Sequence, residues 1–216
     1  MAVSHTQRAQ RREDVRDVLV SPSAESLEEL PAGAVVGTAS LRRQAQVLRL
    51  RPDLRVIPFR GNVDTRLRKL AAGEADATLL ALAGLKRLGR EAAITAILPL
   101  EGFLPAIGQG AIAIAARTND PRTLALLAAL DDAATAAALS LERAFLAVLD
   151  GSCRTPIAGY AHVEGCRVRF RGEILRPDGR EWHFAERAGP ASDAVALGAD
   201  AGRELRTLAP PGFFLV

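Results

Sequence analysis

The 216-residue chain has little of several residue types: it contains two cysteines, one methionine, one tryptophan and one tyrosine. Cys153 and Cys166 form no CxxC pair and have no cluster of histidines beside them, so their spacing argues against a zinc site. We expect a cytoplasmic chain, in which a disulfide is also disfavoured. At least one thiol should therefore be free, either as an inert apolar side chain or as a reactive group.

Long apolar stretches are also missing. No run of about eighteen uncharged apolar residues is present, which excludes a membrane-spanning helix on sequence grounds. Residues 1–16 are polar and rich in arginine, unlike a secretory signal. The basic stretch with Ser and Thr leaves a transit peptide open as an alternative, against which Glu13 and Asp14 argue mildly. Apolar residues make up 49% of the chain and charged residues 25%, which is typical of a globular protein.

Lysine is rare, because 26 of the 28 basic residues are arginine, yet the net charge is only +3. A GC-rich genome, which would also explain the abundant alanine, accounts for most of this excess. The positions of the arginines still matter, since the planar guanidinium binds carboxylates and phosphates through paired hydrogen bonds. The sequence has no long block of like charges and few aromatic residues, which argues against nucleic-acid binding.

From Ala34 onward, short apolar runs alternate with helix signals, the pattern of βαβ units around a parallel sheet. Ser40 is expected to cap the first helix, and Gly73 is expected to end the second. The predicted strands cover residues 34–37, 54–59 and 76–82, and the predicted helices cover residues 40–50, 63–72 and 83–88.

The second half of the chain changes from helices to antiparallel strands. Two helices are predicted at 121–130 and 133–149, followed by strands at 157–163, 166–175 and 181–187 and a helix at 192–208. The fold class is therefore α/β with a small C-terminal α+β domain that contains a three-stranded antiparallel sheet. The expected divisions are a polar lead (1–15), an α/β anion-binding domain (16–104), a crossover (105–132) and the C-terminal domain (133–216).

Basic and hydroxyl side chains follow each of the three predicted parallel strands. Ligands collect at this edge of an open parallel sheet, where helix N termini present free N–H groups and a positive dipole end. Guanidinium groups added there predict a site for a ligand with several anionic groups. The residues at the three junctions are Thr38, Ser40, Arg42 and Arg43, then Arg60, Asn62, Thr65 and Arg66, then Lys86 and Arg87.

The alternative for any one of these arginines is a solvated helix surface, because exposed ion pairs contribute only about 0–1 kcal/mol and are common. Three cationic junctions in one sheet favour a shared polyanion site, although they do not separate carboxylates from phosphates. No GxxxxGK[ST] loop is present, and Gly108-Gln109-Gly110 lacks the third glycine of a dinucleotide fingerprint. Both absences argue against a nucleotide cofactor.

Cys153 lies in the segment Gly151-Ser152-Cys153-Arg154, where a turn and a neighbouring arginine favour an accessible thiolate. The residues alone leave open whether this cysteine is reactive or structural. Cys166, in a predicted hairpin, is expected to be structural. Three histidines lack metal-ligand spacing and receive no role: His5, His162 and His183.

Seven motifs together resemble the hydroxymethylbilane synthase (porphobilinogen deaminase) family, in the family's order from about Arg12 to the C terminus. They are Gly-Thr-Ala-Ser-Leu-Arg-Arg-Gln (37–44), Arg-Pro-Asp-Leu (51–54), Arg-Gly-Asn-Val-Asp-Thr-Arg-Leu (60–67), Gly-Glu-Ala-Asp-Ala (73–77), Ala-Gly-Leu-Lys-Arg-Leu-Gly (83–89), Leu-Pro-Ala-Ile-Gly-Gln-Gly-Ala (104–111) and Gly-Ser-Cys-Arg-Thr-Pro-Ile (151–157). The resemblance implies that the α/β domain is of the periplasmic-binding-protein type.

The resemblance also implies a cofactor and a reaction. Cys153 would form a thioether to a dipyrromethane, on which family members join four porphobilinogen units stepwise, with loss of ammonia, into hydroxymethylbilane for heme biosynthesis. Arg60, Arg66 and Arg87 would also contact the substrate. No metal is implied, and a monomer is expected. The residues implied to bind cofactor carboxylates are Ser40, Arg42, Arg43, Arg60, Arg66 and Arg87.

The family's catalytic aspartate belongs to an N-terminal segment that forms most of its domain 1. No carboxylate of this sequence matches that aspartate by motif, so we expect no catalytic residue here and little activity without a partner supplying domain 1. Residues 105–132 would be a crossover and a remnant of domain 1, in which residues from about Ala111 to Ala128 would have lost their sheet partners. The alternatives are a binding module for anionic small molecules and a non-functional fragment.

Overall fold

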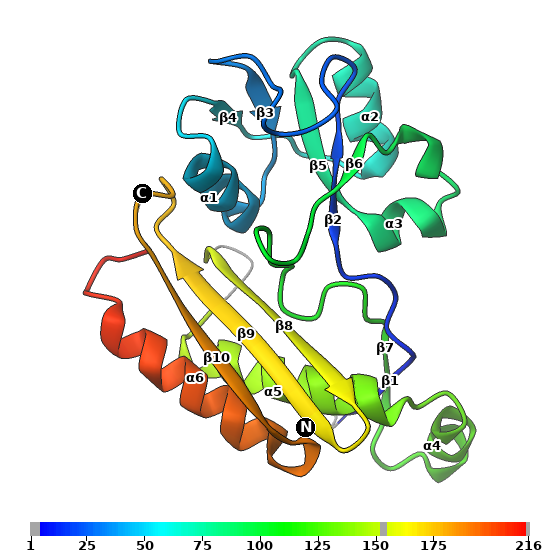
Figure 1. The fold of residues 1–216 in the computed structure, drawn as a ribbon. Helices are drawn as coiled ribbons and strands as arrows, with labels where there is room; N and C mark the ends of the chain where they lie inside the picture. Colours follow the sequence, from blue (N-terminus) through cyan, green and yellow to red (C-terminus); the bar gives the residue numbers. More distant parts are fainter. Residues whose placement is uncertain (1–4, 152–154, 215–216) are drawn as a thin grey trace.

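The computed structural model describes residues 5–151 and 155–214. These residues form a five-stranded mixed sheet, a three-stranded antiparallel sheet and a two-stranded ribbon. Figure 1 shows the five-stranded sheet and its helices above the three-stranded sheet, with the ribbon beside the lower part. Two extended segments, one before β2 and one after β6, connect the upper and lower parts.

The five-stranded sheet has the order β4-β3-β5-β2-β6. β3 pairs in parallel with both β4 and β5, whereas β2 pairs antiparallel with β5 and β6. The predicted α/β class with a parallel core is confirmed, but β2 and β6 were not predicted, because neither belongs to a βαβ unit. The strands are β2 (Asp17–Val20), β3 (Val35–Gly37), β4 (Arg55–Ile57), β5 (Ala77–Ala81) and β6 (Ala96–Ile97).

Helices cover both faces of this sheet, so its central strands are buried on both sides and read as continuous apolar runs. In β2, Leu19 packs in the cluster on one face with Val47 of α1, whereas Val18 and Val20 pack in the cluster on the other. The latter cluster also contains residues of α2 and α3. The helices are α1 (Leu41–Leu50), α2 (Val63–Ala71) and α3 (Leu82–Arg87), and a single 3-10 turn covers Glu91–Ala93.

The C-terminal domain consists of a three-stranded sheet with two helices on one face (Figure 1). Phe145 and Phe170 meet edge to face in its core, with ring centroids 5.0 Å apart. The helices approach closely at Gly198, where a Cβ atom would collide with the Leu141 carbonyl oxygen. The elements are α5 (Ala133–Val148), β8 (Ile157–Glu164), β9 (Arg167–Leu175), β10 (Trp182–Pro190), a 3-10 turn (Ala191–Asp193) and α6 (Ala194–Leu208).

The crossover does not lack sheet partners, which corrects that expectation. β7 (Ala113–Arg117) pairs antiparallel with β1 (His5–Ala9), because the polar lead supplies the complementary ladder of backbone groups. The two segments also run together beyond the ribbon, where the Glu13 N–H donates to the Gly110 carbonyl at 3.0 Å. Gly110 has φ +80, and a Cβ there would lie 2.6 Å from the Glu13 carbonyl oxygen, so this contact requires glycine.

One more helix, α4 (Pro121–Ala128), lies between the ribbon and α5 in the chain. No single helix among the described residues has the length and apolar composition to cross a membrane. α4 and α5 satisfy that criterion only as a pair, across a bend of 109°.

Candidate anion-binding site

The first turn of α1 carries two arginines that point into the protein instead of into solvent. β3 ends at Gly37, where a Cβ would lie 2.6 Å from the Phe59 ring, so the strand packs tightly as it leaves the sheet. Ser40 then caps the helix, with its hydroxyl accepting from the Arg43 N–H at 3.4 Å. Arg42 and Arg43 are only 4% and 8% exposed.

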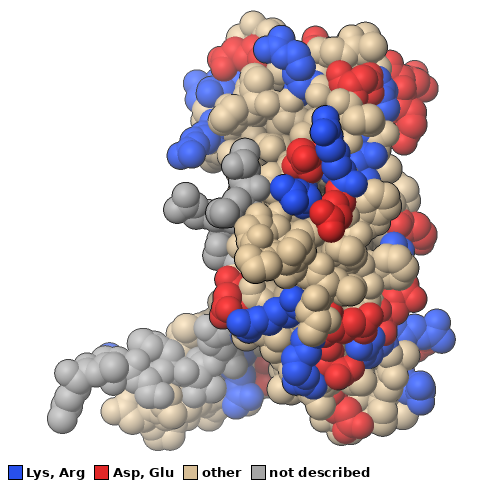
Figure 2. Space-filling model, turned by 90° about the vertical axis from the view of Figure 1, so that its left-hand side faces the viewer, with Lys and Arg blue, Asp and Glu red and all other residues tan. Residues whose placement is uncertain are grey.

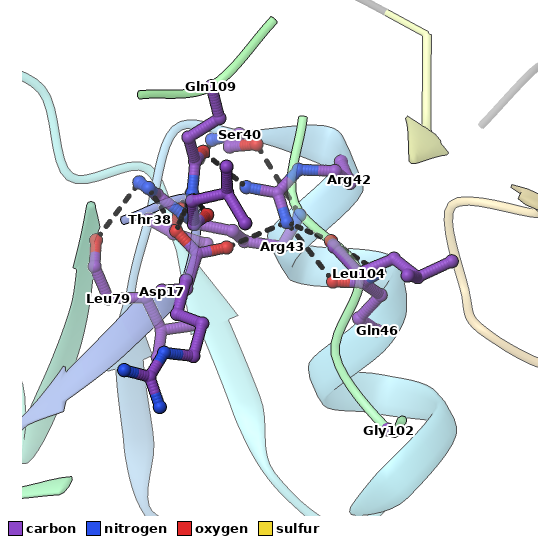
Figure 3. Close-up of polar contacts among 12 residues, drawn as sticks. Asp17, Thr38, Ser40, Arg42, Arg43, Gln46, Leu79, Gly102, Leu104 and Gln109 are labelled. Carbon is purple, nitrogen blue, oxygen red and sulfur yellow. Dashed lines mark hydrogen bonds and ion pairs between the residues drawn. The ribbon is translucent and has the colours of Figure 1, made fainter. Parts of the chain in front are cut away.

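Both guanidinium groups meet the carboxylate of Asp17, the fully buried first residue of β2 (Figure 3). Arg43 donates to Oδ1 through Nη2 at 2.6 Å and through Nε at 3.1 Å. Nη1 of Arg42 forms an ion pair with Oδ2 at 2.8 Å. β2 pairs with β5 in the sheet, and this pairing places Asp17 beside the arginines. An antiparallel strand that the sequence did not reveal therefore supplies their counter-ion.

Backbone carbonyls and one amide complete the cluster. Arg42 Nη1 donates to the Leu104 carbonyl at 2.7 Å, and Arg43 Nη1 donates to the Leu79 carbonyl at 3.1 Å. Gln109, from the crossover, donates through Nε2 to Asp17 Oδ1 at 3.0 Å and accepts from Arg42 Nη2 at 3.4 Å (Figure 3). The glutamine to which the sequence assigned no role therefore ties the crossover to the cluster.

The cluster keeps Asp17 ionised. Burial alone would raise the pKa of Asp17, but the charges of Arg42 and Arg43 and their hydrogen bonds outweigh it and lower the pKa to about 2. The same burial lowers the pKa of the Arg42 guanidinium, against the opposing effect of Asp17. With two guanidiniums and one carboxylate, the cluster has a net charge of +1.

A cavity of about 350 Å³ opens beside the cluster, between the α/β domain and the C-terminal domain. Its polar wall comes from Ser40, Arg42, Arg43 and Arg66. Burial, and then the nearby charge of Arg43, lower the pKa of Arg66. The opposite wall is largely apolar and belongs to the crossover and the C-terminal domain, with Ala106, Ile107, Leu146, Thr155 and Ile157.

The structure thus brings four of the seven predicted site residues to one cavity. Arg60 and Arg87 are exposed and are not among the described residues that line it. Cys153 lies outside the described residues, although Thr155, two positions further along the chain, lines the cavity. The roles of all seven stay predictions at this point. Cys166 is exposed and free of a disulfide in the described part of the chain.

Sequence reasoning missed three buried polar residues around the arginines: Asp17, Gln46 and Glu173. Gln46 Nε2 and Arg49 Nη1 donate to the Glu173 carboxylate at 2.6 and 2.9 Å, which fastens α1 to β9. The available signal for Asp17 was an acidic residue directly before the apolar run Val18 to Val20. No group of three or more His, Cys, Asp or Glu in the described ranges could hold a metal.

Two domains therefore enclose a cavity with a guanidinium wall and an apolar wall, which defines an α/β protein suited to an anionic ligand with apolar parts. The family model for "Porphobilinogen deaminase, dipyromethane cofactor binding domain" matches residues 4–125, and that for "Porphobilinogen deaminase, C-terminal domain" matches residues 136–207. The chain belongs to the porphobilinogen deaminase family. The first match begins inside the segment interpreted as a polar lead.

Curated relatives agree with this assignment. Porphobilinogen deaminase of Nitrobacter hamburgensis is 63% identical over 203 residues, and that of Nitrobacter winogradskyi is 62% identical over 203 residues. Each alignment covers 94% of this chain and 64% of the relative. The chain therefore spans slightly less than two thirds of the length of these relatives.

Two solved structures show a weak likeness to this chain. A putative methionine-binding lipoprotein from Bacillus subtilis has a TM-score of 0.39 and 12% identity, covering 58% of this chain and 60% of that one. An arginine-specific periplasmic binding protein from Salmonella typhimurium has a TM-score of 0.38 and 14% identity, covering 61% of this chain and 59% of that one. These scores are too low to add to the assignment.

Proposed function

We propose that this chain carries the carboxylate-binding part of a hydroxymethylbilane synthase, the transferase that condenses four porphobilinogen units with loss of ammonia in tetrapyrrole biosynthesis. The observation that supports the proposal is the cavity with one cationic and one apolar wall, lined by Ser40, Arg42, Arg43 and Arg66. Pyrrole rings with acetate and propionate arms need both kinds of wall. As a member of its family the chain would act in the cytoplasm, as a monomer or with a partner supplying domain 1.

The residues present fit a dipyrromethane cofactor. Cys153 would hold it covalently, and the hydroxyl of Ser40 together with five arginines would bind its carboxylates: Arg42, Arg43, Arg60, Arg66 and Arg87. When bound, the dipyrromethane supplies the pyrrole to which the first new unit is joined. Arg60, Arg66 and Arg87 would also bind the carboxylates of the incoming porphobilinogen, and the apolar wall would exclude water from the face of the rings.

Fixed guanidiniums contribute by positioning, because holding two reacting rings at the right distance and angle converts an encounter into an intramolecular step. Proton transfer requires a further group. The described lining of the cavity contains no Asp, Glu or His, and Asp17, behind the arginines, is buried and doubly paired. We therefore propose that the chain alone binds porphobilinogen but turns it over slowly or not at all.

Intact-mass measurement of the purified chain tests the cofactor assignment. We expect an adduct of dipyrromethane mass that is lost in Cys153→Ser and retained in Cys166→Ser. A chain without adduct that still binds porphobilinogen would instead support a binding module for anionic small molecules. Rapid consumption of porphobilinogen by the chain alone would contradict the proposed lack of an acid–base group.

A further inference from the structure

The buried carboxylate of Asp17 has a position that the proposed binding reaction does not use. Asp17 is 0% exposed and is not one of the residues that line the cavity, whereas Arg42 and Arg43, which contact it, do line the cavity. The carboxylate therefore lies behind the two guanidiniums relative to the ligand space. Asp17 therefore contacts the guanidinium groups of Arg42 and Arg43 without occupying any of the cavity.

When the site is empty, the Asp17 carboxylate is needed to neutralise the two buried arginines. Among the described residues, no carboxylate other than Asp17 forms an ion pair or hydrogen bond with Arg42 or Arg43. Glu173 is nearby but is paired with Arg49. Two neighbouring buried guanidiniums without a counter-ion would suffer both the loss of hydration and mutual repulsion.

The two arginines nevertheless keep capacity for a second anion. A guanidinium has five N–H donors. Asp17, two backbone carbonyls and the side-chain amides of Gln46 and Gln109 together use only part of the donors on the pair. Nε of Arg42 is buried and has no hydrogen-bond partner within the described ranges. Arg66 adds a third cation to the same wall. The positive charge at the wall thus exceeds what one carboxylate neutralises.

We propose that Asp17 is the resident counter-ion of the anion site, and that it keeps Arg42 and Arg43 buried and aligned until a ligand carboxylate shares them. Asp17 is then a positioning residue, which acts on the ligand only through the two arginines. The inference rests on the proposed function, since it takes the ligand to be a carboxylate that enters the cavity.

The Asp17 carboxylate and a ligand carboxylate should then each be able to supply part of the negative charge that stabilises the two arginines. Asp17→Asn keeps the shape of the side chain and removes its charge, so in the empty chain nothing neutralises the two arginines and the folded state is destabilised. A bound ligand restores negative charge beside the arginines, so the ligand-bound chain loses less stability. The rise in Tm caused by the ligand is therefore larger in Asp17→Asn than in the parent. If Asp17 had a structural role alone, Asp17→Asn would lower Tm by the same amount in the empty and in the ligand-bound chain.

The experiment is thermal unfolding of the full 216-residue chain with and without saturating porphobilinogen. Every variant also carries Cys153→Ser, so that no covalent cofactor occupies the part of the cavity beside Arg42 and Arg43 and free porphobilinogen can bind there. Without ligand, Asp17→Asn should lower Tm by on the order of 10 °C. Porphobilinogen should recover a large part of this loss, and Asp17→Glu, which keeps the charge, should stay nearer the parent in both states.

Glu142→Gln is the matched control, because Glu142 is equally buried and pairs with Arg12 outside the cavity. It should lower Tm by the same amount with and without porphobilinogen. If Asp17→Asn behaves as this control does, Asp17 is a structural acid and the proposal is wrong.

Failure of the proposed function gives a different result. If porphobilinogen leaves the parent unchanged, that function fails, and citrate as a simple tricarboxylate then tests the counter-ion. If citrate raises the Tm of Asp17→Asn more than the Tm of the parent, the proposal is supported. Equal increases in Tm overturn it. If Asp17→Asn cannot be purified folded, refolding from urea replaces the melt. A higher yield with porphobilinogen supports the proposal, and equal yields overturn it.

Discussion

Two fully buried carboxylates, Asp17 and Glu142, organise different parts of the molecule. Glu142 receives two donors from Arg12 at 2.6 and 3.1 Å and two backbone N–H groups, from Gly108 at 2.7 Å and Ala161 at 2.8 Å. One carboxylate thus meets one cation, and the remaining lone pairs are used by the backbone. Asp17 meets two cations beside a cavity.

The difference shows how a structural clamp, the cluster of Glu142 with Arg12 and the N–H groups of Gly108 and Ala161, differs from a binding site. The Glu142 cluster is neutral and saturated, and it joins α5 to the lead, the crossover and β8. The Asp17 cluster keeps a positive excess, which a ligand can neutralise. On the surface the balance is again different, since basic and acidic side chains are interspersed over the face in Figure 2. Arg187, for example, pairs with both Asp200 and Glu204.

The largest effect is expected from breaking the clamp. Glu142→Gln leaves the largely buried Arg12 side chain without its counter-ion and should lower the free energy of unfolding by about 3–5 kcal/mol. Urea denaturation measures this loss, with Glu186→Gln, an exposed side chain, expected within about 0.5 kcal/mol of the parent. A loss below about 1 kcal/mol would show that water reaches Arg12 and that the clamp is weak.

The binding side of the comparison is tested by Arg43→Met, which removes a cation from the cavity wall. Hydrogen bonds to charged groups contribute about 1.5–3 kcal/mol, so the affinity for porphobilinogen should fall roughly 10- to 100-fold. Isothermal titration calorimetry measures the Kd, with Cys153→Ser in every variant so that no covalent cofactor occupies the site beside Arg43. Arg12→Met, which breaks the clamp, should leave the Kd of the folded protein unchanged, and an equal loss in both variants would erase the distinction.

Acid should weaken the Asp17 cluster in a defined range of pH. The pKa of Asp17 is about 2 in the folded protein, below its ordinary value of 3.8, so the unfolded chain takes up the proton first. The stabilisation is complete above about pH 5, declines as the pH falls, and is lost below about pH 2. It amounts to on the order of 2 kcal/mol.

Urea denaturation at intervals from pH 6 to pH 3 measures this slope. Asp17→Asn should have a shallower loss of stability over the range, whereas Glu186→Gln should keep the slope of the parent. Parallel slopes for Asp17→Asn and the parent would mean that the Asp17 carboxylate is not held by the arginines.

The smallest effect is expected at the cap of α1. Ser40→Ala removes the acceptor for the Arg43 N–H, and the long 3.4 Å bond places the cost near the lower end of the usual 0.5–2 kcal/mol, at about 0.5 kcal/mol. Thermal unfolding checks the stability. A much larger loss of porphobilinogen affinity than of stability would show that the Ser40 hydroxyl itself binds the ligand.

The sequence predicted the βα units well because their signals are local. Ser40 does cap α1, α2 ends before Gly73, and the three C-terminal strands lie within one to three residues of their predicted bounds. β2 was missed because a four-residue antiparallel strand beside the parallel core belongs to no βα unit that would reveal it. The pairing of β1 with β7 joins segments separated by more than one hundred residues, and no local pattern encodes that.

By itself, the sequence determined the α/β class, the cationic strand ends and the resemblance to a family, because these depend on residue periodicity and motif order. Only the tertiary structure decided that Arg42 and Arg43 turn inward to Asp17, and that Gln109 and an apolar wall from the C-terminal domain join them. The reason is that a buried charge is tolerated only beside its partner, and the chain supplies that partner from a strand 26 residues before Arg43 that no local pattern links to it.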